Sequence, residues 1–252
     1  MAERPAEELL RRLGITEPKQ IDLDAIAWHL GAAVRYRRMD SADATIIGSE
    51  RRAVISVNSS RIETRQRFSL AHEIGHWQRH RGRILFCTPK DIGNPERSAN
   101  DAERQADRYA SDLILPPYLL RPRLENLQRL ELAPLHKIAA EFNASMTATL
   151  LKIVAMNMFP IVVVCHRRSG RRWFRRSEMI PESWFPQYDL DAVSYAFAML
   201  YRKSPEQSAP RKIRAGAWFD FRDADRYEIR EQSFPLPNDE VLTVLTLPRE
   251  AF

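Results

Sequence analysis

The stretch RQRFSLAHEIGHWQRH, residues 65–80, contains the pattern H-E-x-x-H at positions 72–76. On a helix, residues four apart lie on one face, so the imidazoles of His72 and His76 can reach one ion. Glu73 lies beside them, close enough to take a proton from a water molecule held at that ion. The residues around the motif are uncharged, which is typical of a helix inside an enzyme core. The stretch therefore predicts a buried helix that carries a metal site.

The residues that follow show which lengthened form of the motif the chain has. One form continues with Gly at position 79 and a third histidine at position 82, but the chain has Arg79 and Gly82. The other form takes a glutamate from a following helix, with an acidic residue one turn later. Glu103 and Asp107 have this spacing. Because a catalytic zinc needs a third protein ligand and an open position, we expect the second form.

We therefore predict a catalytic zinc site built by two helices. His72, His76 and Glu103 are the expected Zn²⁺ ligands, and Glu73 is the expected general base. Asp107 can accept a hydrogen bond from an imidazole N–H, which would fix the tautomer and raise the basicity of the ligand. A surface carboxylate paired with a neighbouring arginine is the open alternative for Asp107. This ligand set suits zinc best, although affinity order alone does not decide which metal is used.

Two other side chains are candidates for roles at this site. Cys87 opens a loop-like stretch, residues 87–99, between the two helices. A thiolate is a strong zinc ligand, so Cys87 could take the place of the water and inhibit the enzyme. A small buried hydrophobic residue is the alternative for Cys87. Tyr109 is a candidate transition-state stabiliser, with buried packing as the alternative.

Composition and charge are those of an ordinary soluble globular protein of 252 residues, with 44% hydrophobic and 29% charged residues. The start of the chain is charged and amphipathic, unlike a signal peptide, and no apolar stretch is long enough to span a membrane. The two cysteines do not make a disulfide framework, so we expect a cytoplasmic protein. The net charge of +6 includes an arginine cluster in residues 167–176, which indicates either a solvated face or contact with nucleic acid.

Hydrophobic periodicity and turn residues outline the secondary structure. Helices are expected over residues 3–13, 22–31, 60–80, 101–115, 134–143, 145–157 and 189–201. Strands are expected over residues 32–38, 161–165, 171–176, 215–220, 226–234 and 241–247, with a hairpin over residues 45–58.

The start of the motif helix has its own signals. Ser60 and Glu63 have the spacing of a capping box. The apolar residues expected on the buried side of the helix are Ile62, Leu70, Ile74 and Trp77. Helical patterns give way mainly to strand patterns after Pro160. We therefore predict one domain over residues 1–157 and a second, mixed α/β domain over residues 158–252.

These motifs resemble the ImmA/IrrE family of metallopeptidases. The resemblance rests on FSLAHEIGH (68–76), on E-x-x-A-D-x-Y-A-x-x-L-I-L-P (103–116) and on ID-x-x-x-IA-x-x-LG (21–31). The family usually has Phe at position 109 and Met at position 115, where this chain has Tyr109 and Leu115, and neither difference touches the metal site. The resemblance covers roughly residues 5–157.

The resemblance implies a fold and a role. The implied fold is α+β: a zincin-like, mainly helical metallopeptidase domain with a small N-terminal sheet, followed by a smaller α/β GAF-like sensor domain. Family members typically cleave a helix-turn-helix repressor and so activate genes for mobile-element transfer, stress response or phage defence. We expect single-stranded DNA as the activating signal. In this respect the protein resembles the proteases attached to CBASS-type antiviral operons.

Two other readings remain open. Residues 135–153 have the look of a helix-turn-helix, which favours a DNA-binding regulator, although the second helix carries only Lys152 near its end and offers few groups to base edges. An inactive metalloprotease-like scaffold is the other alternative, but all four catalytic positions are present.

Overall fold

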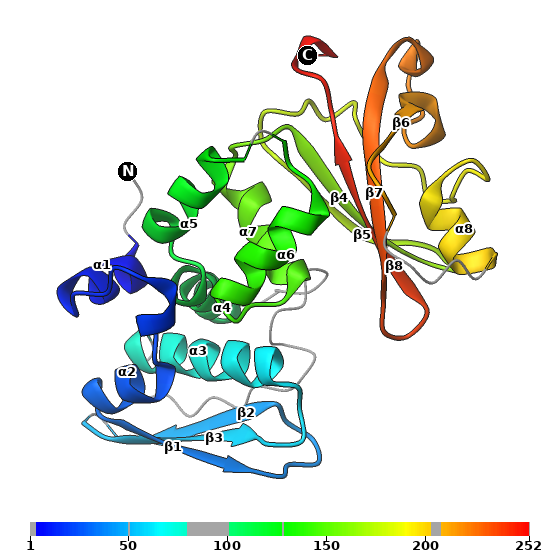
Figure 1. The fold of residues 1–252 in the computed structure, drawn as a ribbon. Coiled ribbons are helices and arrows are strands. Elements are labelled where there is room, and N and C mark those ends of the chain that lie inside the picture. Colours follow the sequence, from blue (N-terminus) through cyan, green and yellow to red (C-terminus); the bar gives the residue numbers. More distant parts are fainter. Residues whose placement is uncertain (1–3, 50, 80–100, 128, 203–207, 252) are drawn as a thin grey trace. The chain divides into compact units, whose positions relative to one another are not determined.

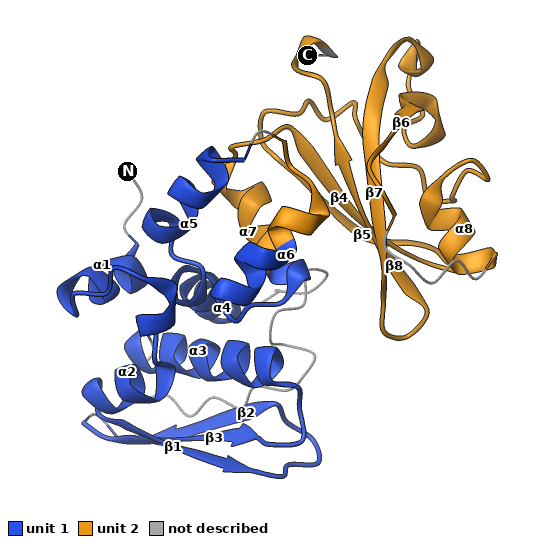
Figure 2. Ribbon diagram, viewed as in Figure 1, with its two compact units in different colours: residues 1–127, 136–148 blue, residues 128–135, 149–252 orange. Residues whose placement is uncertain are grey.

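The computed structural model describes residues 4–49, 51–79, 101–127, 129–202 and 208–251. Contacts between residues divide the chain into two compact units, coloured separately in Figure 2. Unit 1 comprises residues 1–127 and 136–148, and unit 2 comprises residues 128–135 and 149–252. The predicted division into domains at residues 157 and 158 stays a prediction.

Unit 1 contains a three-stranded mixed sheet. Its strands are β1 (Ala32–Arg37), β2 (Ala44–Gly48) and β3 (Ala53–Asn58), in the order β1-β3-β2. β1 pairs with β3 in parallel, and β2 pairs with β3 as an antiparallel hairpin. The predicted hairpin is confirmed, and both outer strands are edges of this sheet.

Helices make up the rest of unit 1, and the periodic residues of the sequence explain most of them. In chain order they are α1 (Pro5–Arg12), the short 3₁₀ helix Pro18–Gln20, α2 (Leu23–His29), α3 (Glu63–Arg79), α4 (Asp101–Ile114) and α5 (Pro117–Glu125). Asp22 caps α2 as predicted, because its side chain accepts a hydrogen bond from the N–H of Ala25. We did not predict α5, which begins at Pro117.

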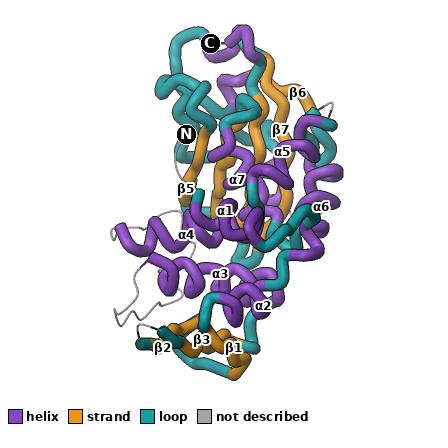
Figure 3. The backbone as a smooth tube through the Cα atoms, turned by 90° about the vertical axis from the view of Figure 1, so that its left-hand side faces the viewer, coloured by secondary structure: helices purple, strands orange, loops and turns teal. Residues whose placement is uncertain are grey.

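The core of unit 1 lies between the sheet and the helices. α2 and α3 lie on one face of the sheet (Figures 1 and 3). Ile55 and Val57 of β3 and Leu70 and Ile74 of α3 are fully or almost fully buried. This burial of apolar side chains is the main force that fixes the position of the motif helix.

The start of α3 differs from our prediction in two respects. Ser60 does not form a capping box with Glu63, because its hydroxyl donates to Oδ1 of Asn58 and the helix begins at Glu63. Ile62 does not belong to the buried side, since it is 75% exposed. The side chain of Asn58 was a stronger local partner for Ser60 than the helix N-terminus.

Unit 2 contains a five-stranded antiparallel sheet in the order β5-β4-β8-β7-β6. The elements are β4 (Ile161–Arg167), β5 (Gly170–Arg176), α8 (Tyr195–Tyr201), β6 (Arg211–Arg214), β7 (Glu228–Leu236) and β8 (Glu240–Thr246). Aromatic residues pack on one face of the sheet, among them Trp184, Trp218 and Phe219. Unit 2 is thus a mixed α and β fold, and its GAF-like character remains a proposal.

One predicted strand of unit 2 is wrong. Residues 215–220 were expected to be extended, but Ala215–Ala217 form a 3₁₀ helix. The strand that pairs with β7 lies just before it, at Arg211–Arg214. Three of the four residues of β6 are charged, so the sequence did not indicate this half-exposed strand. The apolar residues Ala217, Trp218 and Phe219 instead enter the core from the 3₁₀ helix and the turn after it.

Two helices contribute residues to both units, α6 (Leu132–Glu141) and α7 (Met146–Met156). Both were predicted, and Ser145 caps α7 through the N–H of Ala148. Lys152 is buried, so it is not presented to solvent as a DNA-reading side chain would be. No described helix is both long and apolar enough to cross a membrane.

Candidate metal centre

The motif residues lie in the most buried part of α3. Every residue from Ser69 to Trp77 is buried, and His72, Glu73 and His76 are at most 1% exposed. Polar side chains are stable at such depth only when they are hydrogen-bonded, paired or bound to an ion. The depth of these three residues therefore indicates a specific polar site.

α4 crosses α3 at the motif, and Gly75 makes the close approach possible. A Cβ atom at Gly75 would lie 3.1 Å from both Cα and O of Ala106 and 3.2 Å from Cβ of Tyr109. Any larger residue would push α4 outward. Gly75 therefore lets the two helices come close enough for a glutamate of α4 to reach the histidines of α3.

The three predicted ligands meet at this crossing. Nε2 of His72 lies 3.2 Å from Oε2 of Glu103, and Nε2 of His76 lies 3.3 Å from Oε1. The two Nε2 atoms are 3.0 Å apart, with the rings edge to face. One ligand atom from each residue lies within 4.8 Å of the others, so the group could hold a metal ion. The sequence thus predicted which side chains converge.

Asp107 occupies the place that its spacing predicts, one turn after Glu103. Its Oδ1 lies 2.9 Å from Nδ1 of His72. A carboxylate without a proton can only accept, so Nδ1 carries the hydrogen and Nε2 is the nitrogen directed to Glu103 and His76. This contact orients the ring of His72.

The charges of the group support one another. Burial by itself would lower the pKa of His72, but hydrogen bonds to Asp107 and Glu103 raise that pKa to about 9. Burial would raise the pKa of Glu103, but hydrogen bonds to His72 and His76 lower it to about 2. The site therefore favours a carboxylate next to positive charge, which a bound cation would supply in place of protons.

Two further side chains were predicted to have roles at this site. Tyr109 is buried beside Gly75 where α3 and α4 cross, and burial raises the pKa of its hydroxyl to about 12. Its role in the reaction stays a prediction. Cys87 lies outside the described residues, so its role as an inhibitory ligand also stays a prediction. The importance of Gly75 for packing was not foreseen, although a glycine inside a buried helix was a signal.

Two helices thus place two histidines and a glutamate around one point, which is the donor set of catalytic zinc sites. The family model Peptidase_M78, IrrE N-terminal-like domain, matches residues 27–153, half of the chain, and the chain belongs to this family. The predicted resemblance to ImmA/IrrE proteins is confirmed. The match contains α3, α4 and all the predicted site residues.

A comparison with solved structures shows a likeness of fold. The chain is similar to a solved structure described as a Mycobacterium tuberculosis transcriptional regulator, with a TM-score of 0.62 and 11% sequence identity. The likeness covers 96% of this chain and 86% of that chain, so it extends beyond the part that the family model matches. Comparison with curated proteins gives no match. At such low identity, the structural likeness concerns the fold alone.

Proposed function

We propose that this protein is a zinc-dependent endopeptidase that cleaves a partner helix-turn-helix transcriptional repressor and so derepresses stress or phage-defence genes. The convergence of His72, His76 and Glu103 carries this proposal. Membership of a metallopeptidase family supports the reaction class. The repressor, the genes and the signal come from the resemblance and are the parts to be tested.

The spacing of the donor atoms suits zinc. Ligand atoms at about 2.0–2.1 Å from a tetrahedral zinc lie about 3.3 Å from one another. The Nε2 atoms of His72 and His76 are 3.0 Å apart, and each lies 3.2–3.3 Å from one of the two carboxylate oxygens of Glu103. Two imidazoles and one carboxylate are also the donor set of catalytic zinc sites, in which a fourth position stays open.

In the proposed mechanism, each side chain has one task. Zinc, when bound, supplies a Lewis acid and lowers the pKa of water. Glu73 takes the proton of the attacking water and returns it to the leaving amine. Its charge raises the pKa of His72, as expected for a carboxylate close to that ring. Asp107 holds the ring of His72 in one tautomer.

We further propose that unit 2 is a GAF-like sensor domain and that single-stranded DNA is its signal. Tyr188 and Tyr201 are exposed, and their hydroxyls donate to the carbonyls of Ser169 and Arg168 at the turn between β4 and β5. Arg168 also lies over the ring of Tyr201, 6.0 Å from its centroid. Exposed aromatic rings beside arginines are suited to stack on bases.

The arginine cluster itself is only partly available for such a partner. Arg172 pairs with Glu240, Arg176 pairs with Glu182, and Arg171 lies over the ring of Phe185. These three arginines therefore already have partners within unit 2. The turn, and not the whole cluster, therefore supports the nucleic-acid proposal.

The experiment is cleavage of the helix-turn-helix protein encoded beside this gene, by wild type and by Glu73→Gln, with and without single-stranded DNA. We expect cleavage by wild type only, increased by the DNA. Tyr188→Ala and Tyr201→Ala should lose the increase, whereas Trp28→Ala, which changes an exposed aromatic residue of unit 1, should keep it. Equal cleavage by wild type and Glu73→Gln would exclude the mechanism, and equal cleavage with and without DNA would exclude the signal.

A further inference from the structure

The three-stranded sheet of unit 1 has one face that no described helix covers. α2 and α3 both lie on the opposite face, where Ile55 of β3 is fully buried (Figures 1 and 3). Side chains alternate between the two faces of a strand, and residues paired across a sheet share a face. Arg35 of β1 pairs with Ser56, the residue after Ile55, and Arg37 is two residues further along β1. Both arginines therefore lie on the face away from the helices, the outer face.

Arginines follow this sheet along its whole length. Two lie on β1, one directly follows β1, and two lie at the turn between β2 and β3. Because β1 and β3 are parallel, that turn is at the opposite end of the sheet from the end of β1. All five are exposed, and we call them the arginine face: Arg35, Arg37, Arg38, Arg51 and Arg52. A strand of six residues spans about 20 Å, so these charges extend over about six base pairs of DNA.

The side chains of the arginine face have no partner of their own. None of the five makes a hydrogen bond, an ion pair or a ring contact with another described residue. Other exposed arginines of unit 1 are paired: Arg11 with Glu7, for example. Arg123 pairs in the same way with Glu141. An arginine without an internal partner keeps its N–H donors for an external anion.

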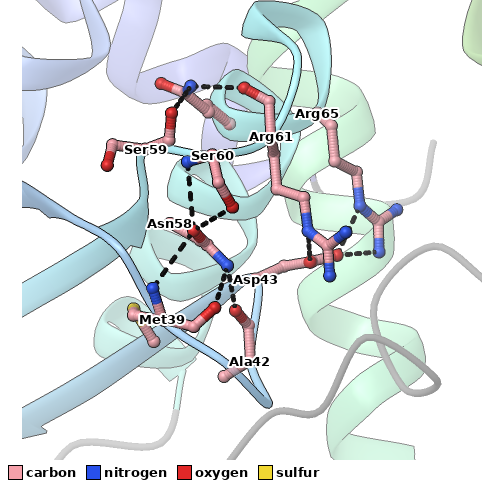
Figure 4. Close-up of polar contacts among 9 residues, drawn as sticks. Met39, Ala42, Asp43, Asn58, Ser59, Ser60, Arg61 and Arg65 are labelled. Atoms are coloured by element: carbon pink, nitrogen blue, oxygen red, sulfur yellow. Dashed lines mark hydrogen bonds and ion pairs between the residues drawn. The ribbon is translucent and has the colours of Figure 1, made fainter.

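A buried carboxylate beside this surface is already neutralised. Asp43 is 3% exposed, and its carbonyl accepts from the N–H of Asn58, the residue that pairs with Arg37. The two carboxylate oxygens of Asp43 accept hydrogen bonds from Arg61 and Arg65, at 2.6 Å and 2.7 Å (Figure 4). Two guanidinium groups on one carboxylate leave one positive charge in excess. The cluster therefore adds to the positive potential of the arginine face.

Asn58 holds the loop that follows Arg38. Its Nδ2 donates to the carbonyls of Met39 and Ala42 (Figure 4). The loop also contains Asp40, the other carboxylate among the described residues of the sheet and its loops, and this one is exposed. Asp40 would repel a polyanion, so its charge can be used to test what the surface binds.

The rest of the outer face indicates which polyanion fits. Besides the two arginines of β1, the residues that share this face by their pairing are Ala33, Thr45, Ile47, Val54, Ser56 and Asn58. None of them is aromatic. Single strands gain much of their affinity from bases that stack on aromatic rings, whereas duplex DNA presents its phosphates along the outside. Unpaired arginines on an open face without aromatic rings therefore favour the backbone of a duplex.

We propose that the arginine face binds the phosphate backbone of double-stranded DNA without regard to sequence. Its guanidinium groups donate hydrogen bonds to phosphate oxygens. The enzyme would then meet a helix-turn-helix repressor on the DNA to which the repressor is bound, and this consequence rests on the proposed peptidase function. The binding of DNA does not depend on cleavage, so the two can be tested separately.

Fluorescence anisotropy with a labelled duplex of arbitrary sequence measures the binding. Phosphate contacts release counterions, so for five contacts the affinity should fall about 500-fold between about 50 and 200 mM salt. Arg35→Gln combined with Arg37→Gln should lower the slope of log affinity against log salt by about two. Because neither side chain has a partner in the fold, the temperature of thermal unfolding should not change. Equal duplex affinity and slope in wild type and this variant would overturn the inference.

Matched variants separate the arginine face from net charge. Arg11→Gln combined with Arg123→Gln removes the same charge from unit 1 and should keep the wild-type slope, because both arginines already have carboxylate partners. Arg35→Lys combined with Arg37→Lys keeps the charge and should keep the slope. Asp40→Asn should strengthen binding. An equal loss in the two pairs of glutamine substitutions would assign the binding to net charge and contradict a specific surface.

A single strand of the same length tests the kind of DNA. We expect Arg35→Gln combined with Arg37→Gln to lose duplex binding, and Tyr188→Ala combined with Tyr201→Ala to keep it. A single strand that binds wild type more tightly than the duplex does, and loses this binding in the arginine variant, would overturn the assignment to duplex DNA.

Cleavage connects the surface with the proposed function. With the helix-turn-helix protein bound to a duplex, the KM of wild type should be lower than with the free protein. In Arg35→Gln combined with Arg37→Gln the two KM values should be equal, with kcat unchanged. Duplex binding by wild type without any cleavage would overturn the proposed function and leave the surface intact. Cleavage without salt-dependent duplex binding would overturn this inference alone.

Discussion

Oδ1 of Asp107 lies 2.9 Å from Nδ1 of His72, so this carboxylate of α4 supports a histidine of α3 while Glu103 of the same helix faces both histidines. One helical turn separates the two carboxylates. Glu103 thus supplies a ligand position, and Asp107 orients the ring of His72. The two effects can be measured separately.

Asp107→Ala should weaken zinc binding about 10- to 100-fold, because His72 loses the partner that fixes its tautomer. The measurement is a zinc titration in competition with a chelating dye. Asp101→Asn is the control, since Asp101 lies on the same helix and is exposed. Equal zinc affinity in Asp107→Ala and wild type would mean that Asp107 does not support the site.

Gly75→Ala should both weaken zinc binding and lower stability. The added Cβ meets main-chain atoms of Ala106 at 3.1 Å, and α4 must move to accommodate it. Overpacking of this kind costs about 1–3 kcal/mol, more than alanine gains over glycine in a helix. Thermal unfolding with and without zinc would measure it. A more stable variant with normal zinc affinity would contradict the tight crossing of the helices.

Acid should destabilise unit 2 through His166. This residue is fully buried, and burial lowers its pKa to about 4. The unfolded chain, with a histidine pKa near 6.5, then binds the proton more readily than the folded chain. Stability is therefore fully present above about pH 6.5 and falls as the pH drops toward 4, by at most about 3 kcal/mol. Denaturant unfolding at pH 7 and pH 5 should show the loss in wild type.

His166→Leu isolates this effect from the other titrating groups. In the variant, the difference in stability between pH 7 and pH 5 should become smaller, because the neutral side chain takes up no proton on unfolding. A pH dependence identical to that of wild type would assign the loss to other groups.

Arg211→Met should destabilise unit 2 by about 2 kcal/mol. Glu231 is fully buried on β7 and pairs with Arg211, so the substitution leaves a buried carboxylate without its cation. Lys212→Met is the matched control, because the neighbouring pair of Lys212 and Glu228 is exposed, so water screens it and its loss should change stability far less. Urea unfolding of both variants would measure the difference.

The sequence predicted the elements whose patterns are local and strong. α3 and α4 follow from helical periodicity and from ligand spacing, and these two helices bring the predicted side chains together. The capping prediction failed because a second local partner was available: the hydroxyl of Ser60 donates to Oδ1 of Asn58, two residues earlier, and does not cap the helix. α5 was not predicted because Pro116 and Pro117 indicate the end of the preceding helix, although proline is also favoured in the first turn of a new one.

Other features could not be read from one sequence. The crossing of α3 and α4 at Gly75 depends on which backbone approaches the glycine, and sequence spacing does not contain that information. Among the described strands, the edge position of β2 depends on strand order, since the same residues in a central strand would be paired on both sides. Such features arise from tertiary arrangement.

The most direct test of the central claim is the zinc content per chain of purified wild type, Glu73→Gln and Glu103→Ala, each loaded with zinc and then dialysed. The account predicts about one zinc in wild type and in Glu73→Gln, because the general base is not a ligand, and almost none in Glu103→Ala. Zinc retained at the wild-type level by Glu103→Ala, or lost equally from Glu73→Gln, would contradict the site described here.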